Sequence, residues 1–395
     1  MNIFLVLGIV FLLTFLIGIG LERIRVPWIF GALIVGLGMA FYNPVAEITD
    51  SESFIFLARL GMFFLLFLIG FELDIEKIRG LKRFIFTSSF AVILSEAFFG
   101  SIFVHYVFHE AWFVSVLVAL SFATVGEAVL IPILDEFRIT KTRLGQIIIG
   151  IGTVDDIIEV LAVVLVAVSL PSLISGGSID FRASTGTITA LVAIAGLFIF
   201  NIALARIKSF MRVKRFFHIN DIYPFMFAVL FTFVGVGMLT HADLPALGAL
   251  LGGITVRNFL SKKHVENIEG YIKSIAYGFF GPIFFLWVGL GTDVRYVIKY
   301  PLLILFVILL TSAIKALVSY LMGRKELGGR ESVVMGIALS VRFSTSIIII
   351  KILFQNNIIH QDLYSVLIGS TAVFTFIIPA VLSYLIPRWR LQPEP

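Results

Sequence analysis

The sequence of 395 residues contains no cysteine and few charged residues, since Asp, Glu, Lys and Arg make up only 14% of it. The lack of cysteine excludes a disulfide framework, a thiolate metal site and a thiol redox switch. Soluble domains carry about 25% charged residues, so the low charge argues against a soluble protein. Hydrophobic residues make up 59% of the chain, which indicates an integral protein of the lipid bilayer.

Other signals are missing as well. Residues 1–21 have neither a basic start nor a small-residue cleavage site, which favours a retained first span over a signal peptide. The spans contain no Gly-x-Ser-x-Gly elbow and no His-Glu-x-x-His motif, so we expect neither an enzyme nor a cofactor. The net charge of +5 comes from short loops, so we expect no nucleic-acid partner. Only residues 387–395 follow the last predicted span, and we expect no soluble regulatory domain.

Apolar segments of helical length recur along the whole chain and predict an all-α membrane protein of about 13 transmembrane helices. Their approximate ranges are 3–21, 27–42, 53–71, 84–106, 112–134, 145–170, 184–205, 221–240, 244–260, 271–291, 299–322, 331–353 and 362–386. The six histidines fall in loops or at helix ends, where solvated side chains are expected.

The basic residues of the loops predict an orientation. Loops after odd-numbered spans hold 23 Lys and Arg residues, and loops after even-numbered spans hold 3. By the positive-inside rule the N-terminus is outside and the C-terminus cytoplasmic. We therefore expect a multi-pass protein of the cell (inner) membrane.

Two motifs occur twice. Gly31-Ala-Leu with Gly36 returns as Gly248-Ala-Leu with Gly253, 217 residues later. The end of the third span, from Phe67 to Asp74, is matched by the end of the tenth span, 219 residues later. A shift of seven spans inverts the second copy in the membrane, as in many secondary transporters. We predict inverted six-helix repeats at residues 1–170 and 216–395, joined by a connecting helix and cytoplasmic loop at 171–215.

A carboxylate cluster lies inside the sixth span. Asp155 and Asp156 are about 100° apart on a helix, and Glu159 returns to the same arc. An ionised Asp at bilayer depth costs at least about 2.5–3.5 kcal/mol, so it is rarely present without a role. The cluster indicates a buried cation and proton site.

Charges from other spans fall at a similar depth, estimated from a rise of about 1.5 Å per residue. This layer holds Glu96, Glu127, Asp155, Asp156, Lys315 and Arg342. Arg59 and Lys351 lie near the outer ends of their spans, where we expect them to reach the interface.

The fifth and twelfth spans carry small and hydroxyl residues at mid-membrane, around Thr124 and Ser344. This composition favours two discontinuous helices that cross, whose facing ends need charge compensation. We expect Glu127 and Arg342 to supply it. The alternative is that each charge only satisfies a neighbouring polar group.

These residues resemble the monovalent cation:proton antiporter superfamily, and in particular bacterial sodium/proton antiporters with a double aspartate. The resemblance covers essentially the whole chain. It rests on Phe67-Leu-Ile-Gly70-Phe-Glu-Leu-Asp74, on Thr124-Val-Gly, on Val154-Asp-Asp and on Lys315. Kef-type potassium efflux systems are wider relatives.

The resemblance implies that Asp156 binds both cation and proton, with Thr124 on the crossing helix beside it. It implies that Asp155 pairs with Lys315 or joins in proton exchange. It also implies a homodimer and elevator-like movement of the ion-carrying core. Glu127 departs from close relatives, which carry an apolar residue there. Together with Glu96 and Glu159 as auxiliary acids, it adds negative charge.

A carboxylate in a partly dry cavity takes either a proton or a hard monovalent cation, which makes exchange obligatory. We therefore expect an electrogenic antiporter for protons and sodium, lithium or potassium, with sodium or lithium favoured. An electroneutral Kef-like potassium/proton exchanger is the nearest alternative. An organic-acid symporter of similar plan would need a cationic pocket, and a passive channel would not need paired carboxylates with a lysine.

Overall fold

The computed structural model describes residues 2–24, 26–73, 83–174, 222–239, 244–260, 262–342, 344–389 and 391. The described part of the chain is helical and contains no strand. Its helices are α1 (Ile3–Arg23), α2 (Phe30–Phe41), α3 (Ala46–Thr49), α4 (Glu52–Glu72), α6 (Arg83–Phe108), α7 (Trp112–Phe122), α8 (Glu127–Glu136), α9 (Arg143–Ile174), α11 (Ile222–Met238), α12 (Pro245–Phe259), α13 (Lys262–Ile275), η3 (Ala276–Phe280), α14 (Gly281–Leu290), α15 (Val294–Lys299), α16 (Pro301–Gly323), α17 (Gly329–Ala338), α18 (Ser344–Gln355) and α19 (Gln361–Arg388).

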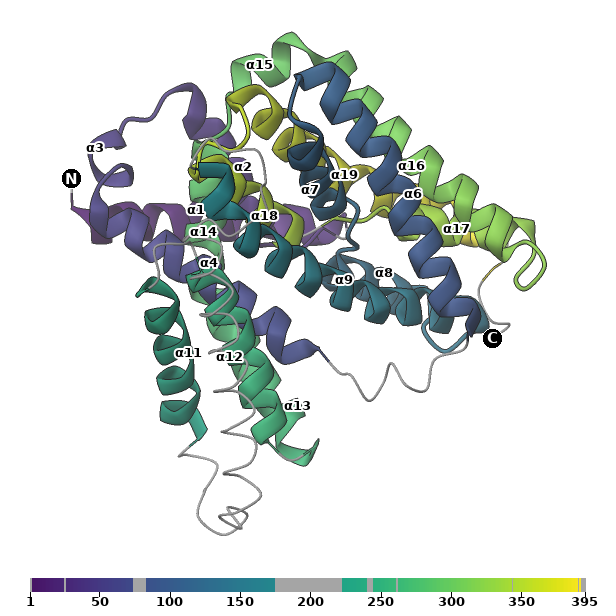
Figure 1. Ribbon diagram of the computed structural model, residues 1–395, viewed down its shortest axis with the longest axis horizontal. Helices are drawn as coiled ribbons and strands as arrows, with labels where there is room; N and C mark the ends of the chain where they lie inside the picture. Colours follow the sequence, from purple (N-terminus) through teal and green to yellow (C-terminus); the bar gives the residue numbers. More distant parts are fainter. Residues whose placement is uncertain are drawn as a thin grey trace. The chain divides into compact units, whose positions relative to one another are not determined.

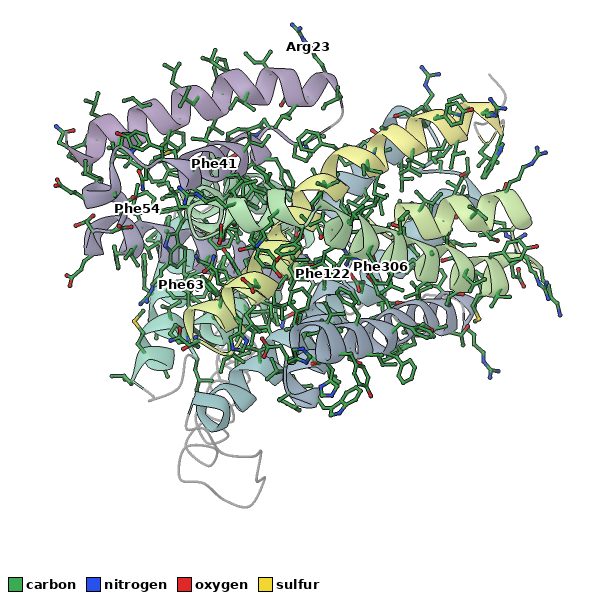
Figure 2. The ribbon with its side chains drawn as sticks, turned by 90° about the horizontal axis from the view of Figure 1, so that it is seen from above. Arg23, Phe41, Phe54, Phe63, Phe122 and Phe306 are labelled. Atoms are coloured by element: carbon green, nitrogen blue, oxygen red, sulfur yellow. The ribbon has the colours of Figure 1, made fainter. Side chains whose placement is uncertain are left out.

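Six of the described helices are long and apolar enough to cross a membrane. They are Ile3–Arg23, Glu52–Glu72, Arg83–Phe108, Ile268–Leu290, Pro301–Gly323 and Gln361–Arg388. The first of them, α1, leaves large apolar side chains such as Phe4 and Phe15 exposed, with Arg23 projecting at its end (Figure 2). Exposed apolar side chains along a whole helix suit contact with lipid, which agrees with the expected membrane protein.

Most of the predicted spans appear as helices, and one differs in its extent. The spans expected at 112–134 and 331–353 are each divided into two helices, α7 with α8 and α17 with α18, as predicted for the two discontinuous helices. The span expected at 271–291 is the end of a longer run from α13 through a π-helical turn, η3, into α14. The span expected at 184–205 lies outside the described residues.

The chain forms two compact units. The first comprises Met1–Ser51, Asp74–Glu159 and Phe285–Pro395, and the second comprises Glu52–Leu73 and Val160–Phe284. This division does not follow the predicted boundaries at 170 and 216, so the inverted repeats stay a prediction about sequence.

In the first unit, α16 lies beside both α6 and α17, as Figure 1 shows. The short helices α7 and α18 contact each other, and α18 also packs on α19. Polar residues of α6, α9, α16 and α18 come together with the segments that follow α7 and α17. The site described below is built there.

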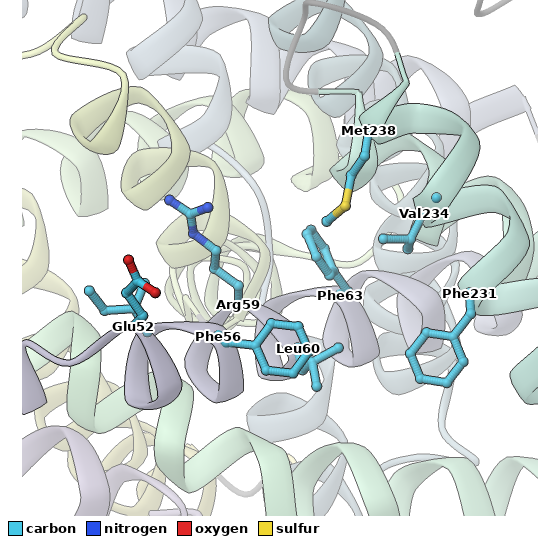
Figure 3. Close-up of a pocket in the computed structure, with 10 residues that line it drawn as sticks. Glu52, Phe56, Arg59, Leu60, Phe63, Phe231, Val234 and Met238 are labelled. Carbon is cyan, nitrogen blue, oxygen red and sulfur yellow. The ribbon is translucent and has the colours of Figure 1, made fainter. Parts of the chain in front are cut away.

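In the second unit, α12 packs against both α4 and α11. Glycine permits the first contact, because a side chain at Gly70 would strike the carbonyl of Leu250 and one at Gly253 would strike that of Phe67. A pocket of about 470 Å³ opens between α4 and α11 (Figure 3). It is lined by Glu52, Ile55, Phe56, Arg59, Leu60, Phe63, Phe231, Val234, Gly235 and Met238.

Candidate functional site

Two helices of the first unit are interrupted, and the interruptions touch. The backbone N–H of Gly126, between α7 and α8, donates to the carbonyl of Val341, between α17 and α18, at 2.8 Å. The hydroxyls of Thr124 and Ser346 also share a hydrogen bond of 2.8 Å. We call the segments Ala123–Gly126 and Leu339–Arg342 the crossing centre. The first interruption contains Thr124, Val125 and Gly126, and the second contains Val341. β-Branched residues and glycine are weaker helix formers than alanine or leucine.

Lys315 of α16 serves two helix ends at once. Its ammonium is fully buried and donates to the carbonyl of Ala123 at 2.8 Å and to that of Leu339 at 2.6 Å. These carbonyls lie at the C-terminal ends of α7 and α17, where the last carbonyls of a helix lack partners and carry partial negative charge. A single cation therefore neutralises the negative ends of both interrupted helices.

Asp155 of α9 serves the opposite kind of helix end. Its Oδ2 accepts a hydrogen bond of 2.5 Å from the backbone N–H of Val125, shortly before α8 begins. The side chain is 1% exposed. A carboxylate beside the positive N-terminal end of a helix is stabilised by the unpaired N–H groups there.

Glu96 of α6 lies between two cations. One carboxylate oxygen accepts from the guanidinium of Arg342, and the other is 3.1 Å from the ammonium of Lys315. Glu96 is 2% exposed, and both cations are fully buried. The guanidinium of Arg342 also lies over the ring of Phe122, with its carbon 3.8 Å from the ring centroid. Ion pairs and the aromatic face together offset the cost of burying this charge.

The predicted layer of charges is thus real for the four side chains that the structure describes in it: Glu96, Asp155, Lys315 and Arg342. Glu96 is more central than its auxiliary role in the prediction, because it contacts two cations. The backbone of Glu127 begins α8, and Asp156 and Glu159 lie in α9, but their side chains are outside the described part of the structure. Their predicted roles stay predictions.

Sequence reasoning missed the contacts of Lys315 with helix ends. It expected Glu127 and Arg342 to compensate the crossing helices, whereas Lys315 contacts the C-terminal carbonyls of both. The available signal was the depth of Lys315, which matched that of the predicted interruptions. The contact between the hydroxyls of Ser346 and Thr124 was also not predicted.

The prediction for Lys351 was wrong. We expected it to reach the membrane interface, but its side chain is 3% exposed. Its ammonium lies over the ring of Trp287, 4.2 Å from the centroid, which offers an apolar alternative to water. Arg59, for which we made the same prediction, is exposed and lines the pocket of the second unit (Figure 3).

Comparison with known proteins was consistent across sequence and structure. The family model described as "Sodium/hydrogen exchanger, transmembrane" matches residues 9–386. The probable Na+/H+ antiporter 3 of Methanocaldococcus jannaschii is 26% identical over 387 residues, covering 97% of this chain and 95% of that protein. The Na+/H+ antiporter of Enterococcus hirae is 26% identical, with 92% of each chain covered.

Among solved structures, the sodium proton antiporter MjNhaP1 from Methanocaldococcus jannaschii superimposes with a TM-score of 0.63 at 17% identity. The match covers 97% of this chain and 95% of that one, and it shows a common fold. Because the family model spans nearly the whole sequence, the chain belongs to the transmembrane sodium/hydrogen exchanger family.

Proposed function

We propose that this protein is a secondary antiporter that exchanges protons for sodium across the membrane. The observation that carries the proposal is the crossing centre. There the buried carboxylate of Asp155 accepts a hydrogen bond from the backbone of an interrupted helix, and Glu96 pairs with Lys315 and Arg342 nearby. Family membership and the names of the full-length relatives support the same reaction.

The described charges of the site balance. Lys315 and Arg342 contribute two positive charges, and Glu96 and Asp155 contribute two negative charges. Any further carboxylate at this depth raises the net negative charge, and Asp156 follows Asp155 directly in α9. An uncompensated buried carboxylate must neutralise itself by binding a proton or a cation. We assign this exchangeable negative charge to Asp156.

Oxygen atoms suited to an alkali cation lie around the same point. The hydroxyls of Thr124 and Ser346 and the carboxylate of Asp155 are oxygen donors of the kind that hard cations prefer. A cation and a proton would compete for the carboxylates. The binding site would therefore change from one side of the membrane to the other with either a cation or a proton bound. This competition couples the two fluxes without a separate device.

Several finer features belong to the proposal. We infer that lithium can replace sodium and that the cycle is electrogenic, with two protons exchanged for one cation. We further infer a homodimer in which elevator-like movement of the ion-carrying helices gives alternating access, as the family resemblance implies. Moving one net charge across 100 mV is worth about 2.3 kcal/mol, so an electrogenic cycle would respond strongly to membrane potential.

A potassium/proton exchanger is the second candidate. The potassium-efflux protein KefC of Shigella flexneri is 23% identical over 76% of this chain, but the match covers 47% of that protein. The chloroplastic K+ efflux antiporter 2 of Arabidopsis thaliana is matched over 21% of its length. Sodium is favoured because the match covers 95% and 92% of the two sodium relatives.

The test is exchange by the purified protein in liposomes that contain a pH-sensitive dye. Sodium, lithium and potassium salts are added in turn. Each is tested with and without an imposed membrane potential that does not depend on a potassium gradient. We expect sodium and lithium to dissipate a preformed pH gradient, and an inside-negative potential to change the rate. Dissipation by potassium alone would favour the second candidate. Protein-containing liposomes that behave as empty ones for every cation would overturn the antiporter proposal.

A further inference from the structure

The pocket between α4 and α11 in the second unit takes no part in the proposed exchange. Its volume of about 470 Å³ is within the range of about 300–1,000 Å³ that is usual for ligand pockets. Most of its lining side chains are apolar, and Phe56, Phe231 and Met238 are exposed. Exposed apolar side chains on a spanning helix suit contact with lipid, so an apolar chain is the kind of group that this pocket can hold.

Two charged side chains lie at one end of the pocket. Figure 3 shows Glu52 and Arg59 at that end and Phe231 at the other. Both charged side chains are exposed. Within the part of the chain that the structure describes, no carboxylate lies at ion-pair distance from the guanidinium of Arg59. An apolar pocket with an unpaired cation at one end fits an amphiphile that carries a negative group at its head.

The pocket has the length of about one membrane leaflet. Its lining residues on α4 extend from Glu52 through Arg59 to Phe63. Glu52 and Phe63 are separated by about 16 Å along a helix that rises about 1.5 Å per residue. Half of the hydrocarbon core of a bilayer is about 15 Å thick. Because Glu52 begins α4, the charged end lies near a membrane surface, and the bias of basic residues predicts the outer one.

The guanidinium of Arg59 suits the phosphate of a phospholipid. Its planar set of N–H donors binds phosphate oxygens in pairs, and it stays charged. An arginine on a spanning helix can extend its long side chain toward the level of the headgroups. The carboxylate of Glu52 at the same end disfavours a headgroup with further negative charge and favours one that carries an ammonium. A zwitterionic phospholipid therefore complements both charges.

We propose that this pocket binds one zwitterionic phospholipid of the outer leaflet, with its phosphate on Arg59 and an acyl chain between α4 and α11. The inference goes beyond ion exchange, because no lining residue of the pocket belongs to the crossing centre. The lipid is a structural ligand of the second unit that contacts both helices. A ligand that binds only the folded protein stabilises it.

The test is native mass spectrometry of the detergent-solubilised protein titrated with phosphatidylethanolamine. We expect one lipid per chain to bind at least about tenfold more tightly than diacylglycerol, which lacks the phosphate. Arg59→Met removes the charge from an exposed position and should weaken binding of phosphatidylethanolamine about tenfold. Arg295→Met is the matched control, because it removes an exposed arginine that does not line this pocket, and it should bind the lipid as the wild type does.

Gly235 allows a separate test of the apolar part of the pocket. Gly235 lines the pocket, and no atom lies within 4 Å of the position of an added Cβ. The side chain of Gly235→Leu therefore has room in the pocket and should compete with the acyl chain, which weakens binding about tenfold for two displaced methylene groups. Gly8→Leu is the matched control, because Gly8 is an exposed helix glycine with equally open space in α1.

Equal affinity of the wild type and Arg59→Met for phosphatidylethanolamine would overturn the lipid site. Diacylglycerol bound as tightly as phosphatidylethanolamine would also overturn it, as would equal affinities for Gly235→Leu and Gly8→Leu. If Arg59→Met or Gly235→Leu turns a dimer into a monomer while lipid binding is unchanged, a second copy of the chain occupies the pocket and the proposal is wrong. The measurement needs no transport, so its failure would leave the antiporter proposal intact.

Discussion

Glu96 contacts two buried cations, Lys315 and Arg342, with one carboxylate. Arg342 and Lys315 come from different helices and would repel each other without it. A buried ion pair does not by itself make a protein more stable than an apolar core would. Removing one partner, however, leaves the other charges buried without compensation.

We predict that Glu96→Gln is strongly destabilising. Removing one member of a buried ion pair costs about 3–5 kcal/mol because the remaining charges lose compensation. Thermal unfolding in detergent should show a clearly lower midpoint for Glu96→Gln than for the wild type. The double variant Glu96→Gln with Arg342→Met should unfold at a higher temperature than Glu96→Gln alone. If the second substitution makes unfolding easier still, the pair is not coupled in this way.

Asp156 is the residue to which we assign the exchangeable proton and cation. Asp156→Asn keeps the shape of the side chain but cannot carry the negative charge for which sodium and protons compete. We predict that liposomes with this variant show no sodium-dependent movement of protons above the background of empty liposomes. The matched control is Asp135→Asn, at an exposed acid of α8 whose carboxylate accepts from the hydroxyl of Thr140, which should retain exchange. Exchange at the wild-type rate in Asp156→Asn would remove this residue from the mechanism.

At the scale of the helices, glycines of the two repeated motifs allow close contacts between pairs of helices. In the first unit, side chains at Gly36 and Gly289 would strike the carbonyls of Leu286 and Leu33, between α2 and α14. In the second unit, Gly253 and Gly70 make the corresponding contacts between α12 and α4. The motif that repeats 217 residues apart therefore has the same packing role in both places, which supports the proposed inverted repeats.

We predict that Gly36→Ala destabilises the protein by about 1–3 kcal/mol, the usual cost of adding atoms to a tightly packed contact. The added methyl group would meet the backbone of α14, which cannot move as a flexible side chain can. Gly38→Ala is the matched control on the same helix, because no atom lies within 4 Å of the position of its added Cβ. Thermal unfolding of the two variants in detergent should separate them clearly. Equal midpoints would contradict the close approach of α2 and α14.

At the scale of the whole molecule, the bias of basic residues predicts which side each loop faces. The cysteine-free sequence makes this testable, because a single introduced cysteine is the sole target for a maleimide. Tyr42→Cys lies at an exposed position at the predicted outer end of the second span, and Lys325→Cys lies at an exposed position in a predicted cytoplasmic loop.

An impermeant maleimide added to intact cells should label Tyr42→Cys and leave Lys325→Cys unlabelled until the membrane is permeabilised. The physical reason is that positive loops resist translocation, so they stay on the cytoplasmic side. The cysteine-free parent serves as the control for background labelling. The reverse pattern would show that the predicted orientation, with the C-terminus in the cytoplasm, is inverted.

Much of the membrane architecture could be predicted from the sequence. Apolar length is a local property, so most spans appeared as helices at the expected positions, and small and hydroxyl residues indicated where two of them are interrupted. The depth of Glu96, Asp155, Lys315 and Arg342 followed from counting residues from the helix ends, because the rise of a helix is nearly constant.

Only the tertiary structure decided which groups meet. Depth along a helix does not specify its rotation or its neighbours, so sequence could not show that Lys315 donates to Ala123 and Leu339, or that Glu96 bridges two cations. For the same reason the sequence analysis misplaced Lys351. Its position near the end of a predicted span suggested that its long side chain reaches water. The rings of Trp287, Tyr364 and Phe354 enclose it instead, and they come together only when three helices pack.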